Sequence, residues 1–145
     1  MEIRTIGFTK HSAEQFFESL KSSGVQQLID VRLNNTSHLA GFAKLSDLPY
    51  FLKSIGGISY RHELQLAPTQ QLLDAYKKNG GGWAAYENDF LELISTRKIE
   101  KSLDREVFEK PSVLLCSEHG PEKCHRRLVA EYLNDKWGGV DIVHL

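Results

Sequence analysis

Five short runs of apolar residues are separated by stretches in which apolar residues recur with helical spacing. The runs cover residues 3–8, 25–31, 58–62, 113–116 and 140–144. Most of them lack a strict alternation of polar and apolar positions, which is typical of strands that are covered on both faces of a parallel sheet. We therefore predict five β-strands, of which the one over residues 25–31 and the one over residues 113–116 should be buried.

The stretches between the runs carry signals of helices. Ser12 and Gln15 match a capping box, in which the two side chains satisfy free backbone N–H groups, and Gly24 stands where that helix should end. Further helices are predicted over residues 45–55, over residues 68–78, from Tyr86 toward Lys101, and from about Pro121, whereas residues 34–42 are predicted to be a loop.

Alternating strands and helices predict the fold class. We expect an α/β fold in which residues 1–145 form a single domain. Its mainly parallel central sheet should have about five strands, with helices on both faces, in a Rossmann-like three-layer arrangement.

Composition and charge narrow the class of protein. The chain has 145 residues, of which 41% are hydrophobic and 26% charged, enough for a globular domain that folds without disulfides or metal. A net charge of -1 disfavours a general nucleic-acid binder, although a local basic patch remains compatible with it. No apolar run approaches the ~18 residues of a membrane span, and the first residues lack a signal-peptide core. We expect a cytoplasmic protein with no membrane association, no cofactor and two reduced cysteines.

Polar side chains follow the carboxyl ends of the predicted strands. Thr9 follows the first strand, Asp30 and Arg32 lie at the end of the second, and Cys116 and Glu118 end the fourth. Parallel strands finish at the same edge of a sheet, and ligands of open α/β sheets bind beyond that edge. We expect these groups to converge on one site.

The segment Cys-Ser-Glu-His-Gly-Pro-Glu-Lys-Cys-His-Arg, residues 116–126, concentrates the candidate chemistry. Because residues of a helix advance by about 100° each, His125 should share the buried face with Val129, one turn later. A helix N-terminus carries a partial positive charge, so we expect a lowered pKa for the Cys124 thiol. The candidate catalytic residues are Cys116, Glu118, Cys124 and His125. The candidate anion-binding residues are Thr9, Asp30, Arg32 and Arg126.

Structural roles compete with these assignments. A cysteine that ends an apolar strand usually belongs to the core. The His125 ring could fasten its helix to a backbone carbonyl, and Asp30 and Arg32 point to the same side of their strand, so they could form a structural pair. Trp83 and Tyr86 either cover a ligand or pack into the core, and packing is the preferred interpretation.

A metal site is the weakest alternative. Cys116, Cys124, His125 and His119 are ligand types that zinc accepts. However, the segment contains no Cys-x-x-Cys pair, and neighbouring Cys and His side chains on a helix should point apart. We therefore predict no metal ligands.

Three motifs occur together in this chain. They are Thr-Ile-Gly at residues 5–7, Asp-Val-Arg at residues 30–32, and Leu-Cys-Ser-Glu at residues 115–118 followed by Pro121 and Cys-His-Arg at residues 124–126. In this combination the chain resembles, over nearly its whole length, the DUF488 family, a bacterial and archaeal domain of unknown function. The first motif of that family often continues with His-Ser, whereas Phe8 and Thr9 follow here, so only the hydroxyl is kept. The resemblance implies a compact α/β domain but no reaction. It marks Asp30, Arg32, Cys116, Glu118, Cys124, His125 and Arg126 as positions of the family pattern.

These observations lead to three functional hypotheses. The first is an enzyme that acts on a small anionic substrate, such as a nucleotide or a nucleic-acid component. The second is a regulatory module that binds a nucleotide or nucleic acid without catalysis, in which the cysteines are dispensable. The third and weakest is a structural metal site.

Overall fold

The computed structural model describes residues 1–145 and contains one five-stranded sheet. The strands are β1 (Glu2–Gly7), β2 (Gln27–Asp30), β3 (Ser59–His62), β4 (Ser112–Cys116) and β5 (Asp141–His144). Their order is β3-β2-β4-β1-β5, and every neighbouring pair is parallel, so β4 lies at the centre. The predicted α/β fold with a five-stranded parallel sheet is confirmed.

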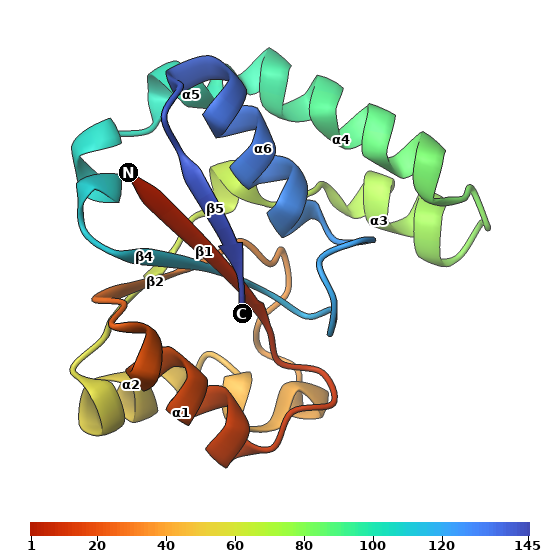
Figure 1. The fold of residues 1–145 in the computed structure, drawn as a ribbon. Helices are drawn as coiled ribbons and strands as arrows, with labels where there is room; N and C mark the ends of the chain where they lie inside the picture. Colours follow the sequence, from red (N-terminus) through yellow and green to blue (C-terminus); the bar gives the residue numbers. More distant parts are fainter.

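Six α-helices cover the two faces of the sheet. They are α1 (Ala13–Ser23), α2 (Leu48–Gly56), α3 (Gln70–Lys77), α4 (Trp83–Arg97), α5 (Ile99–Ser102) and α6 (His125–Trp137). The short 3-10 helices are η1 (His38–Ala43), η2 (Leu64–Leu66) and η3 (Arg105–Glu109). Helices α1 and α2 lie on one face, and α3 to α6 lie on the other (Figure 1). None of the helices combines the length and the apolar composition that a membrane span needs.

Each face has its own hydrophobic cluster. One cluster includes Phe16 and Leu52 and fills the layer beneath α1 and α2. The other includes Phe90 and Leu133 and fills the layer beneath α4 and α6. Two filled layers explain why the inner strands β1, β2 and β4 are largely buried, whereas the edge strands β3 and β5 are partly exposed.

Local capping signals explain several helix boundaries. The Ser12 hydroxyl accepts a hydrogen bond from the Gln15 backbone N–H, and Gly24 ends α1 with a φ of 74°, so both predictions for this helix are confirmed. The helix expected from Tyr86 toward Lys101 is instead interrupted at Lys98, whose φ of 52° separates α4 from α5.

Two other local predictions were wrong. Helix α6 begins at His125 rather than near Pro121, and Cys124 is its extended N-cap residue. The Pro121 carbonyl accepts the Cys124 backbone N–H within a turn, so this proline precedes the helix instead of starting it. Residues 38–42, predicted as loop, belong to η1, where the Ser37 hydroxyl caps the first turn.

The connections place a crevice between β2 and β4. The chain passes from β2 to the face that carries α2, whereas it passes from β4 to the face that carries α6 (Figure 1). These two strands are neighbours in the sheet. Ligands of open α/β sheets bind where neighbouring connections diverge in this way, beyond the carboxyl ends of the strands.

Candidate functional site

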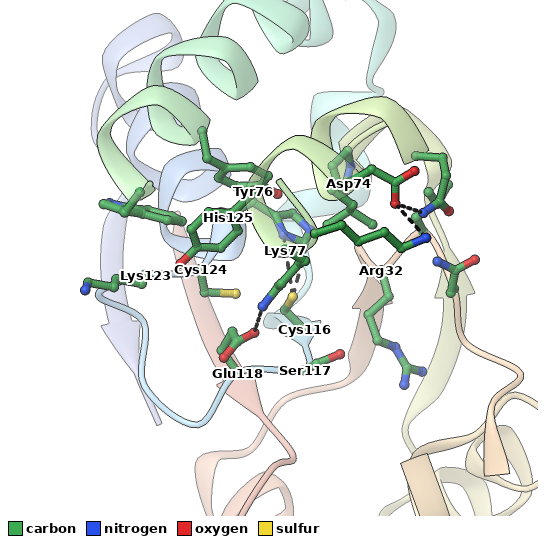
Figure 2. Close-up of a pocket in the computed structure, with 18 residues that line it drawn as sticks. Arg32, Asp74, Tyr76, Lys77, Cys116, Ser117, Glu118, Lys123, Cys124 and His125 are labelled. Atoms are coloured by element: carbon green, nitrogen blue, oxygen red, sulfur yellow. Dashed lines mark hydrogen bonds and ion pairs between the residues drawn. The ribbon is translucent and has the colours of Figure 1, made fainter. Parts of the chain in front are cut away.

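A cavity of about 400 Å³ occupies this crevice. Cys116, Cys124 and His125 line it from β4 and the start of α6, and Tyr76 lines it from α3 (Figure 2). Trp83 at the start of α4 also lines it. Its volume lies in the range of about 300–1,000 Å³ that small-molecule sites occupy. The expected site at the carboxyl edge of the sheet therefore coincides with a cavity of ligand size.

Cys116 and His125 form a pair at the inner end of the cavity. The Cys116 Sγ lies 3.5 Å from His125 Nδ1. On the other side of the ring, His125 Nε2 lies 2.7 Å from the Val31 carbonyl oxygen. Because a carbonyl can only accept, Nε2 carries a hydrogen, and Nδ1 of the neutral ring is free to accept the thiol proton. The prediction of an inward-facing His125 is confirmed, and so is its attachment to a backbone carbonyl.

The surroundings of Cys116 favour its thiolate. The hydrogen bond from the Cys124 thiol holds the pKa of the Cys116 thiol below its ordinary value, although burial opposes this. The backbone N–H groups of Ser117 and Glu118 act in the same direction. These donors stabilise a charge at the end of β4 that apolar surroundings alone would exclude.

The expected lowering of the Cys124 pKa was wrong. Burial raises the pKa of this thiol well above its ordinary value, because only 2% of the residue is exposed. Its hydrogen bond to Cys116 also favours the protonated form. Of the two sulfurs, Cys116 is therefore the one that the site favours as a thiolate. Both cysteines nevertheless belong to the hydrophobic cluster beneath α6, so they also have the structural role that their sequence positions suggested.

Charged side chains surround the mouth of the cavity. Lys77 Nζ pairs with Glu118 Oε1 at 2.9 Å, and this contact joins α3 to the loop after β4 (Figure 2). The same ammonium group lies 5.1 Å from the centre of the Tyr76 ring. Four cationic side chains and two carboxylates line the cavity, and all the cations except Lys123 form an ion pair with a carboxylate. The cationic residues are Arg32, Lys77, Lys78 and Lys123.

Asp30 and Arg32 form the structural pair that the sequence allowed. Arg32 donates from Nε to Asp30 Oδ1 and from Nη2 to Oδ2, both at 2.8 Å. Burial alone would raise the pKa of Asp30, but the hydrogen bonds and charge of Arg32 outweigh it and hold this pKa below its ordinary value. The Tyr60 hydroxyl also donates to Asp30 at 2.6 Å. Arg32 lines the cavity, whereas Asp30 lies behind it.

Arg126 and Thr9, two of the predicted anion contacts, instead hold the loop after β4. Arg126 is fully buried and donates from Nη1 to the Glu118 carbonyl at 2.8 Å and from Nη2 to the His119 carbonyl at 3.2 Å. The Thr9 hydroxyl donates to the Ser117 carbonyl. Neither side chain lines the cavity. The structure thus places them beneath the site and not within it.

The ligand atoms of Cys116, Cys124 and His125 all lie within 4.8 Å of one another. The prediction that the neighbouring Cys124 and His125 point apart was wrong, because Cys124 is extended at the N-cap and not helical. Zn–S bonds of about 2.3 Å and Zn–N bonds of about 2.0–2.1 Å imply a sulfur–nitrogen separation of about 3.5 Å at a tetrahedral site. The observed 3.5 Å between Cys116 Sγ and His125 Nδ1 is the separation that two zinc ligands would have. His119, exposed and bonded to the Thr9 carbonyl, is not part of this group.

Sequence reasoning missed the contribution of α3. Lys77 and Tyr76 reach the cavity because α3 packs beside the loop after β4, a contact between segments about forty residues apart. Nothing in the spacing of α3 itself predicts this. Trp83 and Tyr86 were noted as possible ligand covers, and both line the cavity while packing against Tyr76.

The fold and the site define an α/β domain with a buried cysteine–histidine group at the carboxyl edge of its sheet. The family described as domain of unknown function DUF488 matches residues 12–133 of the 145 residues. The chain belongs to the DUF488 family, as its motifs suggested. No curated protein matches it, and no solved structure does.

Proposed function

We propose that this chain is a cysteine-dependent enzyme that acts on a small anionic substrate, a mononucleotide or another nucleic-acid component. The observation that carries the proposal is the hydrogen-bonded series from Cys116 through His125 to the Val31 carbonyl. A nucleophile, a base and a group that orients the base are the three parts of an activated nucleophile. We expect the enzyme to work in the cytoplasm, where thiols stay reduced.

In the proposed reaction the Cys116 proton passes to His125 Nδ1. The thiolate then forms a bond to an electrophilic centre of the substrate, and the bond between that centre and the leaving group breaks. The leaving group takes the proton from His125, and water later releases the substrate fragment from Cys116. The Val31 carbonyl holds the ring in the tautomer that each transfer needs.

The lining of the cavity supports an anionic substrate with a planar group. Lys123, which has no ion-pair partner, offers positive charge at the cavity, and Lys77 offers more once it leaves Glu118. Tyr76 and Trp83, whose ring centres are 5.8 Å apart, offer aromatic surface against which a base can stack. Glu118 holds Lys77 in place, and we propose that the substrate anion takes over this ammonium group when it binds.

Alkylation by iodoacetamide at neutral pH tests the proposal. We expect one thiol to react faster than free cysteine, and Cys116→Ser to remove this fast reaction while Cys124→Ser keeps it. Adenosine 5′-monophosphate should slow the reaction by occupying the cavity. If Cys116 reacts no faster than free cysteine, the proposal that Cys116 is a nucleophile is contradicted. The hypothesis of a module that binds its ligand without catalysis is then the better one.

A zinc site is the second candidate, and the sulfur–nitrogen distance of 3.5 Å is the observation that favours it. Cys116, Cys124 and His125 would hold the ion, and the Val31 carbonyl would orient the histidine from behind, as outer partners of zinc-bound histidines do. A bound zinc ion would supply Lewis-acid chemistry at the cavity. Elemental analysis of protein purified without a metal-chelating tag distinguishes the candidates: one zinc per chain favours this one, and a folded protein without metal favours the thiol enzyme.

A further inference from the structure

We propose that Cys116 and Cys124 form a reversible intramolecular disulfide when a hydroperoxide enters the cavity. The inference rests on the proposed function in one respect, because it takes Cys116 to be the reactive sulfur. It gives a role to Cys124, which the proposed reaction does not use as a nucleophile.

The positions of the two sulfurs carry this inference. Cys116 ends β4 and Cys124 immediately precedes α6, with residues 117–123 between them, yet their sulfurs lie within 4.8 Å of each other. A disulfide requires a separation of about 2.05 Å, which demands an approach of less than about 3 Å by side-chain rotation and small backbone shifts. The two sulfurs are thus neighbours before any oxidant arrives.

No capping hydrogen bond to α6 holds the Cys124 side chain away from Cys116. Although Cys124 is the N-cap residue of α6, its side chain makes no capping hydrogen bond to the helix. Serine, threonine, asparagine and aspartate are the residues that cap helices well, so a cysteine here contributes little to capping. Moving its sulfur therefore leaves the start of α6 intact.

Reagents can reach the sulfurs of Cys116 and Cys124 only through the cavity. Both cysteines line the cavity, but only 5% of Cys116 and 2% of Cys124 are exposed. A small oxidant such as hydrogen peroxide can enter through the cavity, whereas another protein's thiol cannot easily reach the same sulfurs. This geometry favours a bond within the chain over a bond between chains.

The chemistry needs one hydroperoxide for each disulfide. The Cys116 sulfur attacks the peroxide oxygen, the O–O bond breaks, and Cys116 becomes a sulfenic acid while an alcohol, or water from hydrogen peroxide, departs. The Cys124 sulfur then attacks the sulfenic sulfur, and its proton leaves with the hydroxyl group as water. Two thiols are oxidised by two electrons in total, and the peroxide is reduced. The disulfide removes the nucleophile, so oxidation should stop the proposed reaction until a thiol reductant restores it.

Hydrogen peroxide added in equimolar amount to the reduced full-length protein tests the inference by intact mass. We expect the wild-type chain to lose the mass of two hydrogen atoms and to take up no N-ethylmaleimide after unfolding. Dithiothreitol should restore the original mass and the reaction of both thiols with N-ethylmaleimide. Cys124→Ser should stop at the sulfenic acid, which dimedone traps on residue 116. Cys116→Ser, the matched variant, should give no dimedone adduct and should keep a thiol that reacts with N-ethylmaleimide.

Three results would overturn the inference: a wild-type chain that gains oxygen without forming a disulfide, covalent dimers as the main product, or a Cys116→Ser variant that oxidises as fast as wild type. Failure here is distinguishable from failure of the proposed function. Fast alkylation of Cys116 without disulfide formation would contradict only this inference. Slow alkylation would also contradict the proposal that Cys116 is the nucleophile.

Discussion

Gly7 lies against the backbone of Glu118, so closely that a Cβ atom on Gly7 would overlap the Glu118 carbonyl oxygen. Gly7 ends β1 and pairs with Cys116 at the end of β4. The absence of a side chain lets the loop after β4 fold back across the end of β1, where its carbonyl receives the Arg126 guanidinium at 2.8 Å. The backbone N–H groups that face Cys116 begin this same loop. Gly7 therefore helps to position the donors of the candidate site without touching the cavity.

The substitution Gly7→Ala should destabilise the protein by about 1–3 kcal/mol, because the new methyl group meets backbone and the loop must shift. It should also slow the alkylation of Cys116. Gly120→Ala in the same loop is the matched control, since its Cβ would meet only the flexible carboxylate of Glu122. Urea denaturation of the two variants checks this, and equal stability would contradict the close approach.

Much of the fold was predictable because its signals are local. The apolar runs gave all five strands to within a few residues, and the capping box of Ser12 gave the start of α1. The errors occurred where one local signal had two interpretations. Pro121 suits the first position of a helix as well as the turn that precedes one, and only the path of the loop back toward β4 decides between them.

The location of the candidate site could be predicted from the sequence, but the roles of its individual residues could be predicted only in part. Parallel strands finish at one edge, so the convergence of Cys116 and His125 follows from topology. Topology does not predict which of the two thiols has the lower pKa, because this depends on burial and on the direction of the hydrogen bond between Cys116 and Cys124. The roles of Arg126 and Lys77 were equally hidden: one is covered by a loop and the other comes from a helix distant in sequence.

The buried pair of Asp30 and Arg32 should contribute strongly to stability. Asp30→Asn removes the negative charge and leaves the Arg32 cation, 3% exposed, without a carboxylate. Breaking a buried pair in this way costs about 3–5 kcal/mol. Asp47→Asn, which breaks a partly exposed pair with Lys44, should cost less than about 1 kcal/mol and serves as the control. If chemical denaturation gives similar losses of unfolding free energy for Asp30→Asn and Asp47→Asn, the buried pair contributes no more to stability than the exposed one.

The same pair predicts how stability depends on acid. Arg32 holds the pKa of Asp30 in the folded protein below its ordinary value of 3.8. The unfolded chain therefore takes up a proton at a higher pH than the folded protein does, so the stabilisation is complete above this ordinary value and is lost as the pH falls below it. Thermal unfolding of wild type and Asp30→Asn, measured from pH 6 downward, should show the difference between them shrinking below about pH 4. A difference that stays constant there would contradict the depressed pKa.

Lys77→Ala should separate ligand binding from stability. The side chains of Lys77 and Glu118 are 54% and 45% exposed, so their ion pair should contribute only about 0–1 kcal/mol to folding. Loss of the ammonium group should nevertheless weaken the protection of Cys116 by adenosine 5′-monophosphate about tenfold, as expected for a lost charged hydrogen bond of ~1.5 kcal/mol. Lys53→Ala on α2, outside the cavity, is the control and should leave protection unchanged. Undiminished protection in Lys77→Ala would place the anion elsewhere.

The pH dependence of alkylation tests which group stabilises the Cys116 thiolate. The hydrogen bond from the Cys124 thiol is the main cause that lowers the pKa of Cys116. Cys124→Ala removes this donor, so the protonated thiol is favoured and the rate profile should move to higher pH. Cys124→Ser keeps a hydroxyl that can donate in its place, and its profile should stay close to that of wild type. Rates of iodoacetamide reaction measured across the titration of Cys116 distinguish the variants. If Cys124→Ala leaves the midpoint where it is, the backbone N–H groups of Ser117 and Glu118 and the charge of Arg126 must suffice to hold the thiolate, and Cys124 would be left with its place in the core beneath α6.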